Sequence, residues 1–118
     1  MHVLKSEEVD VRHEFGITVK RLSEGLRDAG RGLPVGLMSC VVPPRESSAL
    51  DSHIDREIFV VVSGKGHVRS GEDKVPIEQG DLVLLESNEP HTVENSSSDA
   101  GLVFLSIYWT EQETISSS

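Results

Sequence analysis

The segment 51-DSHIDREIFVVVSG-64 combines a histidine and several carboxylates with an apolar run, a set of residue types that can bind a metal ion. Side chains of an extended strand alternate between two faces, so Asp51, His53 and Glu57 share one face if the segment is extended. The run 57–63 is apolar on both faces, which predicts a buried strand. A buried carboxylate must be paired, protonated or bound to a cation, and a metal would satisfy Glu57 and His53 together.

A second histidine lies downstream in 80-GDLVLLESNEPHTVEN-95. Gly80 opens a turn into an apolar strand, the residues ESNEP make the next turn, and His91 begins another strand. Two histidines and one carboxylate form a facial triad, which leaves coordination positions open for substrate or dioxygen. Taken singly, His53 is better explained as a surface histidine, and Glu57 as a carboxylate at the start of a strand that pairs with Arg56 or Arg45.

The first stretch resembles the first motif of the cupin superfamily, which is usually G-x5-H-x-H-x3–4-E-x6-G. His53, Glu57 and Gly64 stand at the spacing of its second histidine, its glutamate and its closing glycine. Two positions depart from the motif, because Asp51 replaces the first histidine and Arg45 replaces the opening glycine.

The second stretch resembles the second cupin motif, which is usually G-x5-P-x-G-x2-H-x3-N. Gly80, His91 and Asn95 match its first glycine, its histidine and its final asparagine. Glu86 stands in place of the proline and Asn88 in place of the second glycine. Asparagine accepts a positive φ better than most residues, so the turn tolerates this change.

The resemblance spans about residues 35–109 and implies an all-β fold, the cupin-type double-stranded β-helix or jelly-roll barrel. It implies a single cupin domain over residues 1–110 and one divalent metal ion, with the ligands Asp51, His53, Glu57 and His91. Two carboxylates make the site hard, which favours Fe(II), Mn(II) or Zn(II) over copper. In the alternative arrangement, the two histidines and Glu57 bind the metal, and Asp51 contacts these ligands without touching the metal.

Short strand-like runs separated by turn residues support an all-β fold without any resemblance. No segment sustains a helical period, and SEGLRDAGRGL (23–33) reads as a loop. The tail 111–118 is polar and is expected to be flexible. The runs that predict strands are 17–22, 35–42, 57–63, 66–70, 74–78, 81–85, 91–95 and 101–109.

The composition restricts the classes of partner and the compartment. The chain of 118 residues has 11 Lys and Arg against 20 Asp and Glu, a net charge of −9, which argues against binding to nucleic acid or to an anionic membrane. The single cysteine excludes an internal disulfide, and no apolar leader or 20-residue apolar run is visible. We therefore expect a cytoplasmic protein whose partner is a small molecule.

The expected function is that of a metal-dependent enzyme acting on a small polar metabolite, either an oxygenase or an isomerase, epimerase, lyase or cyclase; no catalytic residue is assigned. The alternative is a cupin that binds a ligand without turnover, or a structural cupin with a degenerate metal site. Phe59, Val61 and Tyr108 are expected to line the pocket. The long apolar final strand, 101–109, and the N-terminal segment indicate a homodimer.

Overall fold

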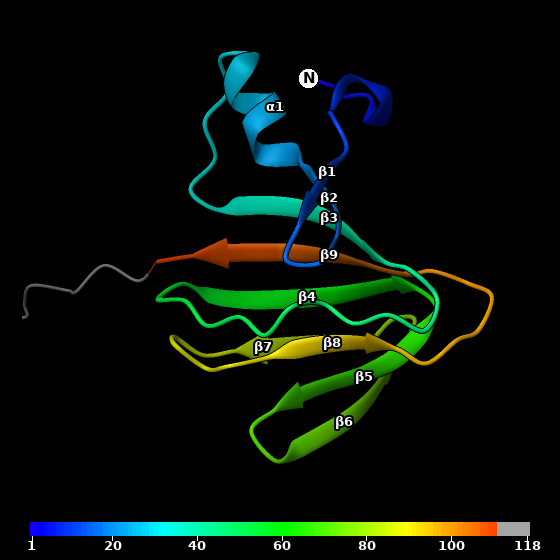
Figure 1. The fold of residues 1–118 in the computed structure, drawn as a ribbon. Helices are drawn as coiled ribbons and strands as arrows, with labels where there is room; N and C mark the ends of the chain where they lie inside the picture. The colour runs from blue at the N-terminus through cyan, green and yellow to red at the C-terminus, as the bar shows by residue number, and fades with distance from the viewer. Residues whose placement is uncertain (111–118) are drawn as a thin grey trace, which may run out of the picture.

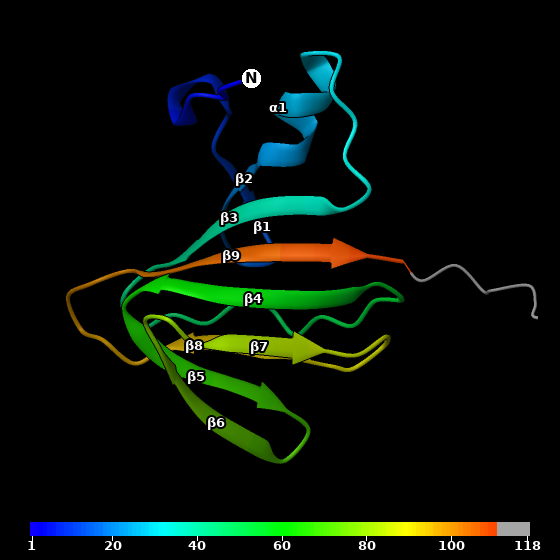
Figure 2. The same ribbon diagram turned by 180° about the vertical axis from the view of Figure 1, so that it is seen from behind.

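The structure is a computed structural model that describes residues 1–110, and its backbone forms two antiparallel sheets (Figures 1 and 2). The larger sheet has the strand order β1-β2-β3-β9-β4-β7 and the smaller one β6-β5-β8, so the predicted all-β fold is confirmed. No helix among the described residues is long and apolar enough to cross a membrane. The predicted tail, 111–118, lies outside the described residues. The elements are η1 (Ser6–Glu8), β1 (Arg12–Glu14), β2 (Ile17–Arg21), α1 (Leu22–Asp28), β3 (Gly36–Val42), β4 (Arg56–Ser63), β5 (Lys65–Ser70), β6 (Asp73–Glu78), β7 (Leu82–Leu85), β8 (Thr92–Asn95) and β9 (Leu102–Trp109).

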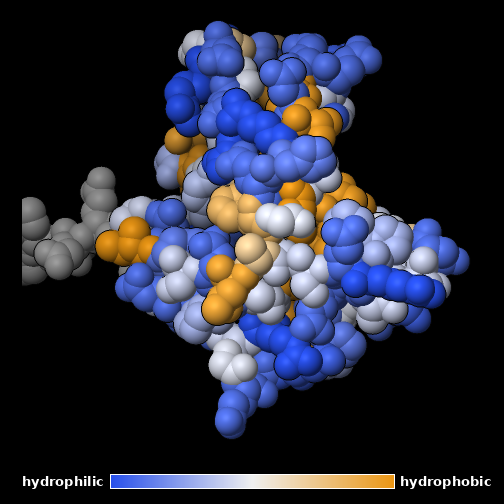
Figure 3. Space-filling view, viewed as in Figure 1, coloured by the Kyte–Doolittle hydropathy of each residue, from blue (hydrophilic) through white to orange (hydrophobic). Residues whose placement is uncertain are grey.

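The core lies on the inner faces of the two sheets, where every second residue is apolar. In β3 the alternation buries Met38, Cys40 and Val42, and in β9 it buries Leu102 and Phe104. Each fully buried aliphatic side chain stabilises the fold by about 1.5–3 kcal/mol. Outward positions are more polar, and the face shown in Figure 3 is largely hydrophilic, with hydrophobic residues gathered near its middle.

The final strand, β9, lies in the middle of the larger sheet, hydrogen-bonded to β3 on one side and β4 on the other. Its apolar character therefore reflects a central position in the sheet. The register places Tyr108 between Gly36 and Glu57. A Cβ atom on Gly36 would lie 2.1 Å from the Tyr108 ring, so only glycine lets this ring cross its neighbour.

The helix α1 departs from the predicted elements, because the sequence predicted a loop over 23–33. The helix is seven residues long, too short to show a helical period, and tertiary contacts hold it in place. The buried Ser23 hydroxyl accepts a hydrogen bond from the Leu37 backbone N–H at 3.1 Å. Gly25 faces the Leu4 side chain, because a Cβ atom on this glycine would lie 2.9 Å from a terminal methyl group of Leu4.

Candidate metal centre and adjoining cavity

Backbone hydrogen bonds join the two motif segments at the candidate site. Asp51 and His91 form an isolated antiparallel bridge, in which each backbone N–H donates to the other carbonyl, at 3.1 and 2.9 Å. The Asn88 N–H donates to the His53 carbonyl at 2.6 Å. Asn88 and Arg45, which stand where the cupin motifs usually have glycine, both adopt a positive φ, of 62° and 63°. The backbone of both motifs is therefore kept although the glycines are replaced.

The two histidine rings are oriented in the same way. Nδ1 of His53 lies 3.1 Å from the Asp55 carbonyl oxygen, and Nδ1 of His91 lies 2.9 Å from the Glu89 carbonyl oxygen. A carbonyl oxygen can only accept, so each Nδ1 carries the hydrogen and donates it. The Nε2 atom of each ring is left to face the site, which is the arrangement typical of histidines that bind metal.

Glu57 places a buried carboxylate between the two rings. Its side chain is 6% exposed, and Oε1 lies 3.0 Å from Nε2 of His53 and 3.6 Å from Nε2 of His91. The other oxygen, Oε2, accepts a hydrogen bond from the buried Ser106 hydroxyl. A carboxylate oxygen and an imidazole lone pair at 3.0 Å repel each other unless a proton or a cation lies between them.

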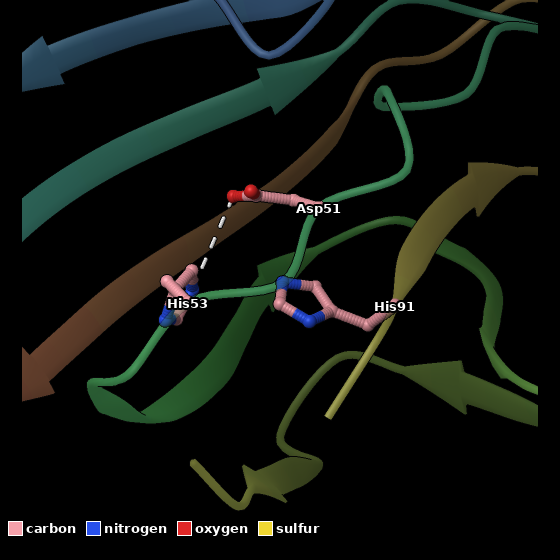
Figure 4. A group of neighbouring side chains, drawn as sticks. All are labelled: Asp51, His53 and His91. Atoms are coloured by element: carbon pink, nitrogen blue, oxygen red, sulfur yellow. Dashed lines mark ion pairs between the residues drawn. The ribbon is translucent and has the colours of Figure 1, made fainter. Parts of the chain in front are cut away.

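Asp51 completes the group from the loop that precedes β4. Its Oδ2 atom lies 4.0 Å from Nε2 of His53, and one ligand atom from each of Asp51, His53 and His91 lies within 4.8 Å of the others (Figure 4). Two imidazole nitrogens that face the site and two carboxylates form a donor set that suits a divalent cation. The residues present therefore fit a metal ion, which would relieve the repulsion at Glu57.

The group opens into a cavity of about 280 Å³. Phe59 and Tyr108 are among the residues that line it, and the Phe59 ring lies edge-on to the His91 ring, with the ring centroids 5.8 Å apart. Val61 is 2% exposed and belongs to the apolar core instead of the cavity lining. It lies one inward position further along β4 than Phe59, where the strand enters the packed interior.

Two lining residues that the sequence interpretation did not assign to the site carry polar chemistry. Arg21 is the last residue of β2 and lies two residues after the buried Val19, so its side chain is on the core-facing side of the strand. A charged residue at such a position is the feature of the sequence that could have identified Arg21 as a site residue. Cys40 also lines the cavity, and burial, with a smaller effect of the Glu57 charge, raises the pKa of its thiol to about 12. Cys40 is therefore a protonated wall residue at neutral pH and not a nucleophile.

Known proteins share this fold and part of this sequence. Residues 38–108 match the family model of the cupin domain. The solved plu4264 protein from Photorhabdus luminescens superimposes with a TM-score of 0.79 at 26% identity, covering 94% of this chain and 88% of that one. The predicted jelly-roll barrel of the cupins is thus confirmed.

Two curated relatives match a shorter segment. A Thermotoga maritima protein named "Oxalate-binding protein" is 33% identical over 67 residues, which are 56% of this chain and 54% of the relative. An uncharacterized Methanocaldococcus jannaschii protein is 26% identical over 66 residues, 55% of this chain and 53% of the relative. The matched part of the chain thus spans about half the length of the curated relatives. Because the family model matches well over half of its residues, the chain belongs to the cupin family.

Proposed function

We propose that this cupin binds one divalent metal ion through His53, His91, Glu57 and Asp51 and is an enzyme that acts on a small polar metabolite in the adjoining cavity. The observation that carries the proposal is the pair of Nδ1–H donations to backbone carbonyls, because they aim both Nε2 atoms at the same buried carboxylate. A purely structural histidine pair would not need both rings fixed in this orientation.

The donor set of two nitrogens and two carboxylates favours Fe(II), Mn(II) or Zn(II). Such an ion supplies Lewis-acid chemistry and, in the case of iron, oxidation chemistry, so both the oxygenase class and the isomerase, epimerase, lyase or cyclase class are compatible with the site. The chain itself supplies the geometry. Ser106 orients Glu57, and the rings of Phe59 and Phe104, whose centroids are 4.6 Å apart, form an apolar wall that limits the entry of water.

The second candidate is a cupin that binds its ligand without turnover. The name of the Thermotoga maritima relative, an oxalate-binding protein, favours this candidate and suggests a small carboxylate as the ligand. Conversion of a ligand by the metal-loaded protein, followed by chromatography or oxygen uptake, separates an enzyme from a binding protein.

The metal assignment is tested by elemental analysis of protein purified without chelator, followed by titration with Fe(II), Mn(II) and Zn(II). We expect about one metal equivalent in the unmodified protein and its loss in the His91→Ala variant. The matched control is His67→Ala, because His67 lies on β5 outside the cavity lining. Full metal occupancy in the His91 variant would refute the ligand assignment, and no uptake of any of the three ions would refute the proposed function.

We also propose a homodimer, formed through the outer face of the larger sheet. The side chains of Val62, Leu82 and Leu84 are apolar and are 46, 61 and 45% exposed, and Leu84 pairs with Ile58 across β4 and β7. Exposed apolar side chains on the outer face of a sheet are typical of a protein–protein interface. Light scattering should give twice the chain mass, and Leu82→Glu combined with Leu84→Glu should give the monomer; a monomeric unmodified protein would contradict the proposal.

A further inference from the structure

Arg21 is the one Lys or Arg side chain among the described residues that line the cavity. Its Nε and Nη2 atoms donate to the two oxygens of Glu14, at 2.8 and 2.7 Å, and its Nη1 donates to the Tyr108 hydroxyl at 3.3 Å. A guanidinium group has five N–H donors, so these three bonds leave one hydrogen on Nη1 and one on Nη2 without an acceptor among the described residues. Two such hydrogens suit the paired oxygens of a carboxylate.

The guanidinium is held in a defined orientation. Glu14, in β1, accepts hydrogen bonds from one edge of the guanidinium with both carboxylate oxygens. The Phe15 ring faces the guanidinium, with its centroid 6.0 Å from the Arg21 Cζ atom. This pairing holds the pKa of the Glu14 carboxyl below its usual value and raises that of Arg21, so the pair stays charged at neutral pH. Preorganisation of this kind lowers the entropy lost when a ligand binds.

Arg21 and the candidate metal centre lie along the same cavity, with Tyr108 between them. Tyr108 contacts Arg21 through its hydroxyl and stands opposite Glu57 in the register of β9 and β4. The ion pair of Arg12 with Glu24 offers a contrast, because it joins the same β1 strand to α1 at the surface, outside the cavity lining. A salt bridge that served only to fasten the N-terminal strands would not require a guanidinium facing the cavity.

We propose that Arg21 binds an anionic group, such as a carboxylate, at the end of the ligand that lies away from the metal. The ligand class is then a small metabolite with an oxygen donor for the metal at one end and a carboxylate for Arg21 and Tyr108 at the other. This inference rests on the proposed function, because it assumes that the metal centre holds the first end. Glu14 is a positioning residue in this scheme, since it touches the guanidinium and not the ligand.

The test compares dicarboxylates with their half-amides, which have the same length and one charge fewer. Malonate, succinate and glutarate, each with its half-amide, are titrated calorimetrically into metal-loaded protein whose metal content has been measured first. We expect at least one diacid to bind tenfold to hundredfold more tightly than its half-amide, the effect of a charge-assisted hydrogen-bond pair. In Arg21→Gln this ratio should fall below about threefold while the metal content stays unchanged.

Two further variants make the result interpretable. Arg12→Gln removes the same charge from the N-terminal strands and should keep the unmodified ratio. Arg21→Lys keeps the charge and the partner Glu14 but lacks the planar fork, so it should lower the ratio at least threefold even if Arg21→Gln does not fold. An unchanged ratio in the Arg21 variants, or no diacid preference in the unmodified protein, would overturn the inference while metal binding persists. Failure of the unmodified protein to take up metal would instead overturn the proposed function, and the inference with it.

Discussion

Replacing Ser106 by alanine should weaken metal binding without removing any metal ligand. Ser106 is fully buried, and its hydroxyl donates to Oε2 of Glu57, the oxygen that does not face the histidines. The variant leaves that oxygen without its donor and frees the carboxylate to rotate. Loss of a residue that orients a ligand typically reduces metal affinity by about 10- to 100-fold.

The same hydrogen bond also contributes to folding. A hydrogen bond to a charged group contributes about 1.5–3 kcal/mol, so the metal-free Ser106→Ala variant should lose up to that amount in its free energy of unfolding. Serine and alanine differ by one oxygen atom, so packing changes little.

Calorimetric titration with Zn(II) or Mn(II) measures the first effect, and urea unfolding of the metal-free protein measures the second. Ser39→Ala is the matched control, because Ser39 lies in β3 at an outward, half-buried position of the same sheet. The control should change both quantities little. A metal affinity of Ser106→Ala within twofold of the unmodified protein would refute the reasoning that Ser106 holds Glu57 in place for the metal.

Three other perturbations test the cavity and the core. Asp51→Asn removes a negative charge with almost no change in side-chain volume, and it should lower the metal affinity at least about tenfold in the calorimetric titration. An unchanged affinity would show that Asp51 is not a metal ligand. Leu102→Ala should lower the free energy of unfolding by about 2–5 kcal/mol because Leu102 is fully buried, whereas the 74% exposed Leu50 should tolerate alanine with little loss. Cys40 should resist iodoacetamide at pH 8 in the folded protein and react on unfolding, because its raised pKa keeps the thiol protonated. Since the folded pKa exceeds the ordinary value, the neutral thiol stabilises the fold below about pH 9, and that contribution is lost as the pH rises toward 12.

Much of the fold was accessible from the sequence because alternation and turn residues are local signals. The strand predicted at 57–63 appears as Arg56–Ser63, and the one predicted at 101–109 appears as Leu102–Trp109. The helix Leu22–Asp28 was missed because it is short and is held by packing, not by its own period. Val61 was predicted to line the pocket but lies in the packed core. The alternation of side chains along a strand predicts which face a residue is on, but not whether the cavity extends to that residue.

Motif spacing was sufficient to nominate Asp51, His53, Glu57 and His91, because both motifs are local and their order is kept. Only the tertiary structure decided how these side chains meet, since the Asp51–His91 bridge joins segments 40 residues apart and carbonyl groups orient both imidazole rings. Arg21 shows the same division. The alternation of residues in β2 predicts that Arg21 faces the core. Its contact with Tyr108 depends on the side-by-side pairing of β2, β3 and β9, which no local sequence pattern specifies.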